Sequence, residues 1–404
     1  MAASETYAER NPVETVFTST KTASPRAPSL DVLRGLLLVW MTLTHLPTRV
    51  SIYSNQVIGY VSAAEGFIFL AALLTGQIYR RSSSREGTAS ARRRPLQRAF
   101  RIYRYHIGLL AVAFIFAGAA ASFLHRVPLQ NLLDFYLQHP KVALAAAPGL
   151  LYNPPLLDIL PVYIVFMVLT PALLWAIERR GWRAVLGASA LVWFLAQFQL
   201  RTWIYNAAAH HGFPIPLNET GAFDLFGWQF LWTTGLVLGS SEPGTRFSGS
   251  RISRPLLALC GAIAITLFIC RHTAFDTLTG PALFDVLVDK WKLGILRLIN
   301  FAALSVILIK YGPRLAATKI GLRFAPLGRA SLEVFSAHVL FCLVVLGFGQ
   351  GPDPRFAWWQ DAIILTAVLT GLFMVAEIVE RRRIRAKEAI TAPRLAFAPE
   401  PLLR

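Results

Sequence analysis

An arginine and a histidine occur together in the first apolar stretch of the sequence. Arg34 and His45 are eleven positions apart. On an α-helix, eleven residues turn through about 1100°, which is within about 20° of three full turns, and rise by about 16 Å. Both side chains therefore point the same way. We expect one helix to carry an arginine near one end and a histidine near the other, on a single face.

These residue types suit two kinds of chemistry. An arginine guanidinium binds phosphate groups with a planar set of N–H donors, and a neutral imidazole can accept a proton as a general base. Glu65 lies in the next apolar stretch at a depth that His45 can share, and a carboxylate beside an imidazole fixes its tautomer. The alternative is structural: Arg34 pairs with Asp31 at the membrane edge, and His45 and Glu65 only satisfy hydrogen bonds in a buried position.

The elements that position these residues must cross a lipid bilayer. Of the 404 residues, 55% are apolar or aromatic and only 15% are charged, and the mean hydropathy is +0.50. Soluble domains, in contrast, are about 25% charged. The net charge of +18 alone would suggest a nucleic-acid partner, but the chain has too few polar residues for a nucleic-acid-binding protein. We predict an all-α integral membrane protein that binds no nucleic acid.

Ten stretches are long and apolar enough, or nearly so, to span a bilayer, which takes about 20 helical residues. Together they predict a bundle of about ten transmembrane helices. The predicted spans are Leu30–Leu46, Ile58–Tyr79, Ile107–Leu124, Leu156–Ile177, Ala184–Leu200, Phe223–Gly239, Pro255–Cys270, Leu293–Ile309, Leu327–Gly347 and Asp361–Val379.

Lysine and arginine residues set the expected orientation of the bundle. With the N-terminus inside, 29 of the 40 lysines and arginines fall in inside segments and 8 in outside segments. The densest block, Arg80–Arg104, contains nine arginines. Because basic loops resist translocation, both termini are predicted to be cytoplasmic.

The sequence divides into three parts. Residues 1–29 are polar and rich in Thr, Ser and Pro, and are predicted to be a disordered cytoplasmic tail. Residues 30–380 form the membrane domain, and residues 381–404 form a basic cytoplasmic tail. The three cysteines lie inside predicted spans and match no metal-ligand spacing, so no metal site is expected.

The pattern Arg34-x10-His45 is similar to the signature of the acyltransferase-3 superfamily of integral membrane acyltransferases. The surrounding sequence resembles the OpgC branch of that superfamily, which is linked to succinylation of osmoregulated periplasmic glucans. A departure is Ala71-Ala72, where the family usually has Ser-Gly. The further segments that carry the resemblance are Ala64–Leu70, Leu157–Tyr163, Gly227–Gln229, Asp289-Lys290 with Leu296–Asn300, and Leu327–Phe335 followed by His338.

The resemblance implies a multi-pass protein of the bacterial inner membrane. It would transfer an acyl group, succinyl in this branch, from cytoplasmic acyl-CoA to a hydroxyl of a periplasmic glucan. Acyl-CoA is a co-substrate in this scheme, and no tightly bound cofactor is expected; the partners are acyl-CoA, the glucan and the lipid bilayer. Arg34 and Arg329 are the candidates for binding the CoA phosphates, although Arg329 can instead pair with Glu333 at i,i+4.

In this scheme His45 is the general base that removes the proton of the acceptor hydroxyl as it attacks the thioester carbonyl, and Glu65 orients His45. His338 is expected near the middle of the membrane. It could polarise the thioester oxygen, donate a proton, or be a core histidine without a catalytic role. No serine or cysteine with a base partner is evident, so direct transfer without an acyl-enzyme is expected.

Residues at the expected outer ends of spans are candidates for binding carbohydrate. Carboxylates and amides hydrogen-bond sugar hydroxyls, and an indole face covers the apolar side of a pyranose. Lys290 or Arg297 can attract the free carboxylate of a succinyl group, and Trp228 can instead belong to the aromatic belt of a membrane protein. The candidates are Asp158, Trp228, Gln229, Lys290 and Arg297.

Other functions fit the same membrane architecture. A related acetyltransferase would modify another surface polysaccharide. A transporter of glycans or lipid-linked sugars would also carry ionisable residues in its spans, although transporters often contain an internal repeat and none is evident here. A non-catalytic membrane subunit would tolerate alanine at His45.

Overall fold

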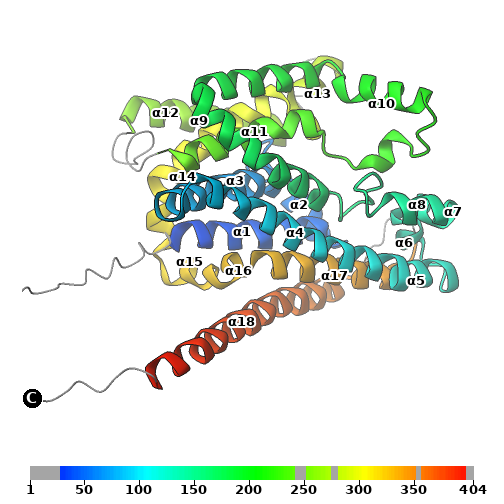
Figure 1. Ribbon diagram of the computed structural model, residues 1–404. Coiled ribbons are helices and arrows are strands. Elements are labelled where there is room, and N and C mark those ends of the chain that lie inside the picture. The colour runs from blue at the N-terminus through cyan, green and yellow to red at the C-terminus, as the bar shows by residue number, and fades with distance from the viewer. Residues whose placement is uncertain (1–27, 242–251, 274–280, 352–355, 397–404) are drawn as a thin grey trace, which may run out of the picture.

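The computed structural model describes residues 28–241, 252–273, 281–351 and 356–396, and this part of the chain is helical with connecting loops (Figure 1). Helix α1 (Pro28–His45) lies in the middle of the bundle. It contacts α3 (Ala63–Glu86) on one side, and α16 (Ala325–Arg329) and α17 (Ser331–Phe348) on the other. Residues of α1 can therefore face a protein interior rather than lipid.

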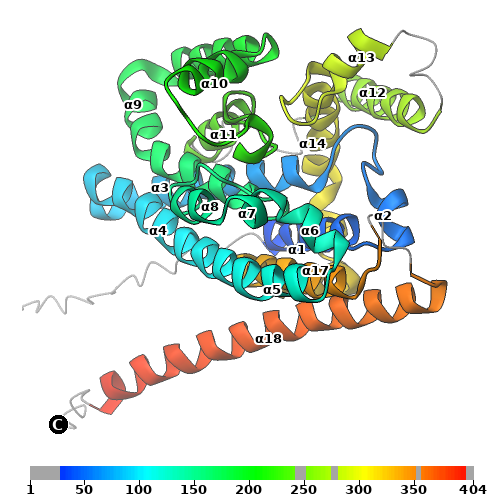
Figure 2. The same ribbon diagram turned by 90° about the vertical axis from the view of Figure 1, so that its right-hand side faces the viewer.

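The other helices pack around this centre, and α18 lies along the outside of the bundle against α16 and α17 (Figures 1 and 2). Their bounds are α2 (Arg49–Ser54), α4 (Thr88–Val112), a π-helix (Ala113–Ala117), α5 (Gly118–Phe123), α6 (Val127–Leu132), α7 (Asp134–Gln138), α8 (Pro140–Ala146), α9 (Ile159–Gln197), α10 (Leu200–His210), a 3-10 helix (Leu217–Thr220), α11 (Leu225–Ser240), α12 (Arg254–His272), α13 (Pro281–Val288), α14 (Ile295–Ala316), α15 (Lys319–Arg323) and α18 (Trp358–Ala396).

Several of these helices are long and apolar enough to cross a membrane. The prediction of an all-helical, multi-pass membrane protein is therefore confirmed, whereas the number of ten spans stays a prediction. Six helical stretches in the described residues meet the length and composition of a span: Thr88–Phe123, Ile159–Gln197, Arg254–His272, Ile295–Ala316, Ser331–Phe348 and Trp358–Ala386.

Some helices begin or end at residues other than those predicted, and local backbone chemistry explains these differences. The second span starts later than predicted, at Ala63, because Ser62 and Glu65 form a capping box at its N-terminus. The fourth and fifth spans form one stretch, α9, interrupted at Gly181, whose φ of +80° favours glycine. The ninth begins at Ser331, because the residues before it belong to the short helix α16.

The start of α1 and the second half of α18 lie at the same end of the bundle. Arg34 of α1 donates to the Ser331 hydroxyl, and Arg383 of α18 lies 3.2 Å from the Glu333 carboxylate, also at the start of α17. A shared end agrees with the predicted orientation, but its cytoplasmic location stays a prediction. Of the predicted tails, residues 1–27 and 397–404 lie outside the described residues, and residues 381–396 continue α18 as a helix.

Candidate active site

Two polar pairs join α1 to α17. Near the start of α1, the Arg34 guanidinium donates to the Ser331 hydroxyl. At the end of α1, His45 Nδ1 lies 3.0 Å from His338 Nε2, and the two rings stack with their centroids 5.2 Å apart. Arg34 and His45 thus share one face of the helix, as predicted, and α17 is the neighbour that this face contacts.

The hydrogen bonds around the two histidines define their tautomers. His338 Nδ1 lies 3.3 Å from the Phe335 carbonyl oxygen, which can only accept, so His338 Nδ1 carries a proton. In a neutral imidazole the other nitrogen is then an acceptor, so His338 Nε2 accepts from His45 Nδ1–H. This leaves His45 Nε2 unprotonated, and no hydrogen bond occupies it among the described residues. His45 is therefore arranged as a proton acceptor.

Apolar side chains separate the two polar pairs. Leu38 and Met41 of α1 are 1% and 3% exposed, and Phe335 of α17 is 1% exposed. Phe335 also stacks on Phe67 of α3. An acyl chain that connects the Arg34 end with the His45 end would therefore have to displace packed apolar side chains.

Glu65 has partners other than His45. Its Oε1 accepts from Arg297 Nε and Nη2 at 2.9 and 2.5 Å, and its Oε2 accepts from the Ser62 N–H and hydroxyl at 2.9 and 2.5 Å. Both members of the Glu65–Arg297 pair are fully buried. The expected contact between Glu65 and His45 is therefore wrong, because both carboxylate oxygens are engaged elsewhere and His338 makes the contact with His45.

Arg297 is likewise not a surface residue. It projects from the first turn of α14 into the bundle, where Glu65 takes two of its nitrogens. Asn300 follows one turn later, and its Oδ1 accepts the Tyr60 N–H at 2.9 Å. The Asn300 Nδ2 is buried and has no hydrogen-bond partner among the described residues. Arg297 thus serves the interior of the bundle rather than an exposed carbohydrate surface.

Lys290 lies within electrostatic range of several residues of this region. It interacts with His45, Glu65, Arg297 and Asp158. Partial burial lowers the pKa of the Lys290 ammonium, while the Glu65 and Asp158 carboxylates oppose that shift. Burial also raises the pKa of Asp158 to about 6, against the Ala222 N–H that hydrogen-bonds to it. The structure therefore gathers these five predicted residues into one polar cluster around the end of α1.

Trp228 and Gln229 have structural positions. Trp228 is fully buried, and its Nε1 donates to the Trp291 carbonyl oxygen at 3.0 Å. The neighbouring Gly227 leaves room for the Lys292 backbone, which a Cβ there would meet. Gln229 hydrogen-bonds to Ser189 of α9. The Gly-Trp-Gln segment therefore holds the loop that carries Lys290, and neither Trp228 nor Gln229 is placed as a surface ligand for sugar.

Arg329 does not pair with Glu333. Its guanidinium contacts Glu380 of α18 at 2.7 Å, whereas Glu333 contacts Arg101 at 2.6 Å and Arg383 at 3.2 Å. The alternative i,i+4 pair with Glu333 is therefore wrong, because α4 and α18 bring competing arginines to Glu333. Arg329 is already neutralised in part, which weakens its case as a phosphate ligand.

The sequence patterns did not single out three residues of this region. Ser331 accepts a hydrogen bond from Arg34, and the buried Asn300 Nδ2 has no hydrogen-bond partner in the described part of the chain. Trp291 exposes 44% of its surface beside Lys290, whose Nζ lies 4.8 Å from the Trp291 ring centroid. Asn300 and Ser331 belong to segments that carried the family resemblance. Their hydrogen bonds, however, depend on helices far apart in the sequence.

The fold and the site define a class: a multi-pass helical membrane protein with a buried polar cluster at the end of a central helix. The family model described as OpgC protein matches residues 26–384. The chain belongs to this family, and membership indicates a transferase with a role in periplasmic glucan modification. No match was found among curated proteins or among solved structures.

Proposed function

We propose that this protein transfers an acyl group, succinyl in the first instance, from cytoplasmic acyl-CoA to a hydroxyl of a periplasmic glucan. The observation that carries the proposal is the His45–His338 pair, which leaves a basic nitrogen at the end of α1 within the bundle of a protein of the OpgC family. The proposal also places the protein in the bacterial inner membrane, within the acyltransferase-3 superfamily.

His45 Nε2 is the proton acceptor in the proposed reaction. It removes the proton of the glucan hydroxyl while the hydroxyl oxygen attacks the thioester carbonyl carbon. The carbon–sulfur bond then breaks, and the proton held on Nε2 passes to the departing CoA sulfur. His338 is a positioning residue, because its Nε2 accepts the His45 Nδ1–H and so keeps His45 in the reactive tautomer.

The cluster at the end of α1 supports a role in acceptor binding. Asp158 is half-buried and lies within electrostatic range of Lys290, and a carboxylate there can accept hydrogen bonds from sugar hydroxyls. Trp291, rather than Trp228, has exposed indole surface for a pyranose. For a succinyl group, Lys290 is the remaining cation, because Glu65 already binds Arg297.

The test is made in the native host. His45→Ala and a His45→Gln companion are expected to remove ester groups from periplasmic glucans, measured by mass spectrometry, while the protein stays in the membrane at wild-type abundance. Glucans with unchanged esters would overturn the role of His45. Loss of acetyl groups with succinyl groups retained would correct the acyl group, and loss of esters from a different polysaccharide would correct the acceptor.

A further inference from the structure

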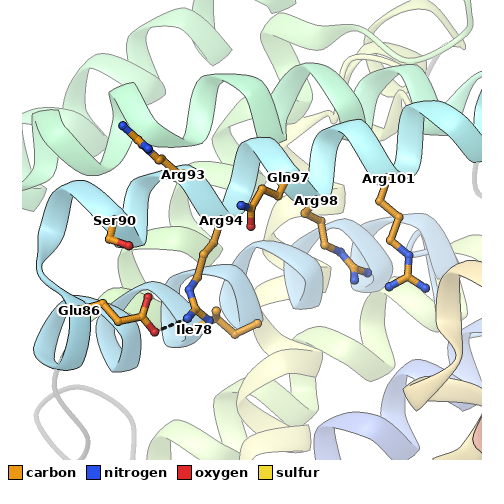
Figure 3. A pocket seen from close by; sticks show the side chains of 8 residues that line it. All are labelled: Ile78, Glu86, Ser90, Arg93, Arg94, Gln97, Arg98 and Arg101. Carbon is orange, nitrogen blue, oxygen red and sulfur yellow. Dashed lines mark hydrogen bonds and ion pairs between the residues drawn. The ribbon is translucent and has the colours of Figure 1, made fainter. Parts of the chain in front are cut away.

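A groove of about 580 Å³ opens along the first half of α4 (Figure 3). This volume falls in the range of about 300–1,000 Å³ that is usual for small-molecule sites. Arg94, Arg98 and Arg101 point to the same side of the helix, and Ser90 and Gln97 add neutral polar groups (Figure 3). The block Arg80–Arg104, interpreted above as a topology signal, thus also forms a concave surface.

The lining of the groove is strongly cationic. Four arginines line it, and Glu86 is the one acidic residue in the lining. Glu86 pairs with Arg94, whereas Arg98 makes no ion pair among the described residues. The Arg93 side chain points to the opposite side of α4 (Figure 3). Guanidinium groups gathered around a hollow in this way suit phosphate groups, which they can bind through charge-assisted hydrogen bonds.

A second, apolar recess of about 80 Å³ adjoins the groove. The two share Arg94 and Arg98, and the recess reaches between α3, α4 and α9 to Thr75, Pro95 and Met167. A ligand with phosphates at one end and a less polar chain at the other would match both parts. Free phosphate would use only the groove.

The groove also leads toward the Arg34 end of α1. Arg101, at the end of its lining, contacts Glu333 at 2.6 Å. Glu333 lies two residues from Ser331, which accepts the hydrogen bond from Arg34. A long ligand bound in the groove would therefore have its far end close to the Arg34–Ser331 pair of α1 and α17.

We infer that this groove binds the phosphate groups of a nucleotide thioester, with Arg98 as the main ligand. The inference rests on the proposed function, since it gives the acyl donor a binding site. The groove takes the phosphate-binding role that the sequence predicted for Arg329, which Glu380 neutralises. Arg34 would then contact the part of the donor beyond the phosphates. An anionic phospholipid carries the same phosphate chemistry, so the test must distinguish it from the nucleotide thioester as the occupant of the groove.

The test measures the affinity of the full-length protein, in detergent, for CoA, dephospho-CoA and pantetheine. Arg98→Gln is expected to weaken CoA binding by about tenfold or more, because it removes charged hydrogen bonds to phosphate. Pantetheine, which has no diphosphate, should bind weakly to all variants alike. The matched control is Arg104→Gln, an exposed arginine on the same helix that does not line the groove. Size-exclusion profiles and thermal unfolding check that the variants remain folded.

The outcomes separate this inference from the function on which it rests. If wild type binds CoA and Arg98→Gln binds it equally well, or if Arg104→Gln weakens binding as much as Arg98→Gln, the groove assignment is overturned while the proposal of acyl-CoA as donor stands. If wild type binds no CoA, the proposal that acyl-CoA is the acyl donor is overturned. If Arg98→Gln lowers affinity only for phosphatidylglycerol vesicles, the groove is a lipid site and the inference falls.

Discussion

The two ends of α1 differ in how completely their charged side chains are paired. At the His45 end, the buried carboxylate of Glu65 pairs with Arg297, and the histidines engage each other and a backbone carbonyl. At the Arg34 end, exposed arginines outnumber the acidic residues that they contact along α4. Fixed donors and acceptors suit a step that needs atoms in precise positions, whereas an excess of cations suits capture of an anion from water.

The comparison predicts that substitutions at the two ends change different kinetic constants. The largest effect is expected for His45→Ala. Loss of a general base should lower kcat by about 10²–10⁴-fold, because proton removal is then left to water, while the KM for acyl-CoA changes little. The measurement is transfer of labelled acyl groups to glucan by membrane vesicles. A raised KM with unchanged kcat would place His45 in donor binding and erase the distinction between the two ends.

Glu65→Gln tests whether the buried ion pair organises the His45 end. The substitution leaves the Arg297 charge buried without a counter-charge, which should lower the free energy of unfolding by about 3–5 kcal/mol. Denaturant unfolding in detergent micelles measures this loss. The matched control is the double variant Glu65→Leu/Arg297→Met, which removes both charges and should recover most of the stability. If Glu65→Gln is as stable as wild type, the pair contributes little.

His338→Leu and His338→Gln test the tautomer argument. Leucine removes the acceptor for His45 Nδ1–H and should lower kcat by about 10–100-fold, as expected for loss of the group that holds a general base in position. Glutamine keeps an acceptor oxygen and should retain more activity. Equal activity in the two variants, with both proteins folded, would show that His338 fills space without orienting His45.

Much of this arrangement could be predicted from helical periodicity. The shared face of Arg34 and His45 follows from eleven residues on one helix, and the strong polarity of the α4 block was evident from its arginines. Periodicity also gives the depth of a residue in the bilayer, and for this reason the sequence predicts Glu65 at the same depth as His45. Depth does not say which helix packs alongside, however, and the partner of Glu65 is Arg297, 232 positions away along the chain.

Other features depend on packing between segments that no local pattern connects. Arg329 meets Glu380 rather than Glu333 only because α18 lies against α16. Trp228 was placed at the outer end of a span, where tryptophans usually meet the interface, but its Nε1 instead supports the loop that carries Lys290. The Gly227–Gln229 motif therefore identified a segment next to the polar cluster, but the carbohydrate-binding role predicted for Trp228 was wrong.

Asp158 gives the smallest expected effect and tests whether the His45 end responds to pH. Burial raises its pKa to about 6 from 3.8, so the folded state favours the protonated carboxyl. This contribution to stability is complete below the ordinary pKa of 3.8 and is lost as the pH rises through about 6. Thermal unfolding of wild type between these pH values should therefore show Tm falling toward pH 6, and Asp158→Asn should lack that component. Identical pH profiles for the two proteins would mean that Asp158 is solvated like an ordinary surface carboxylate, and the cluster around Lys290 would keep Glu65 as its one acidic member.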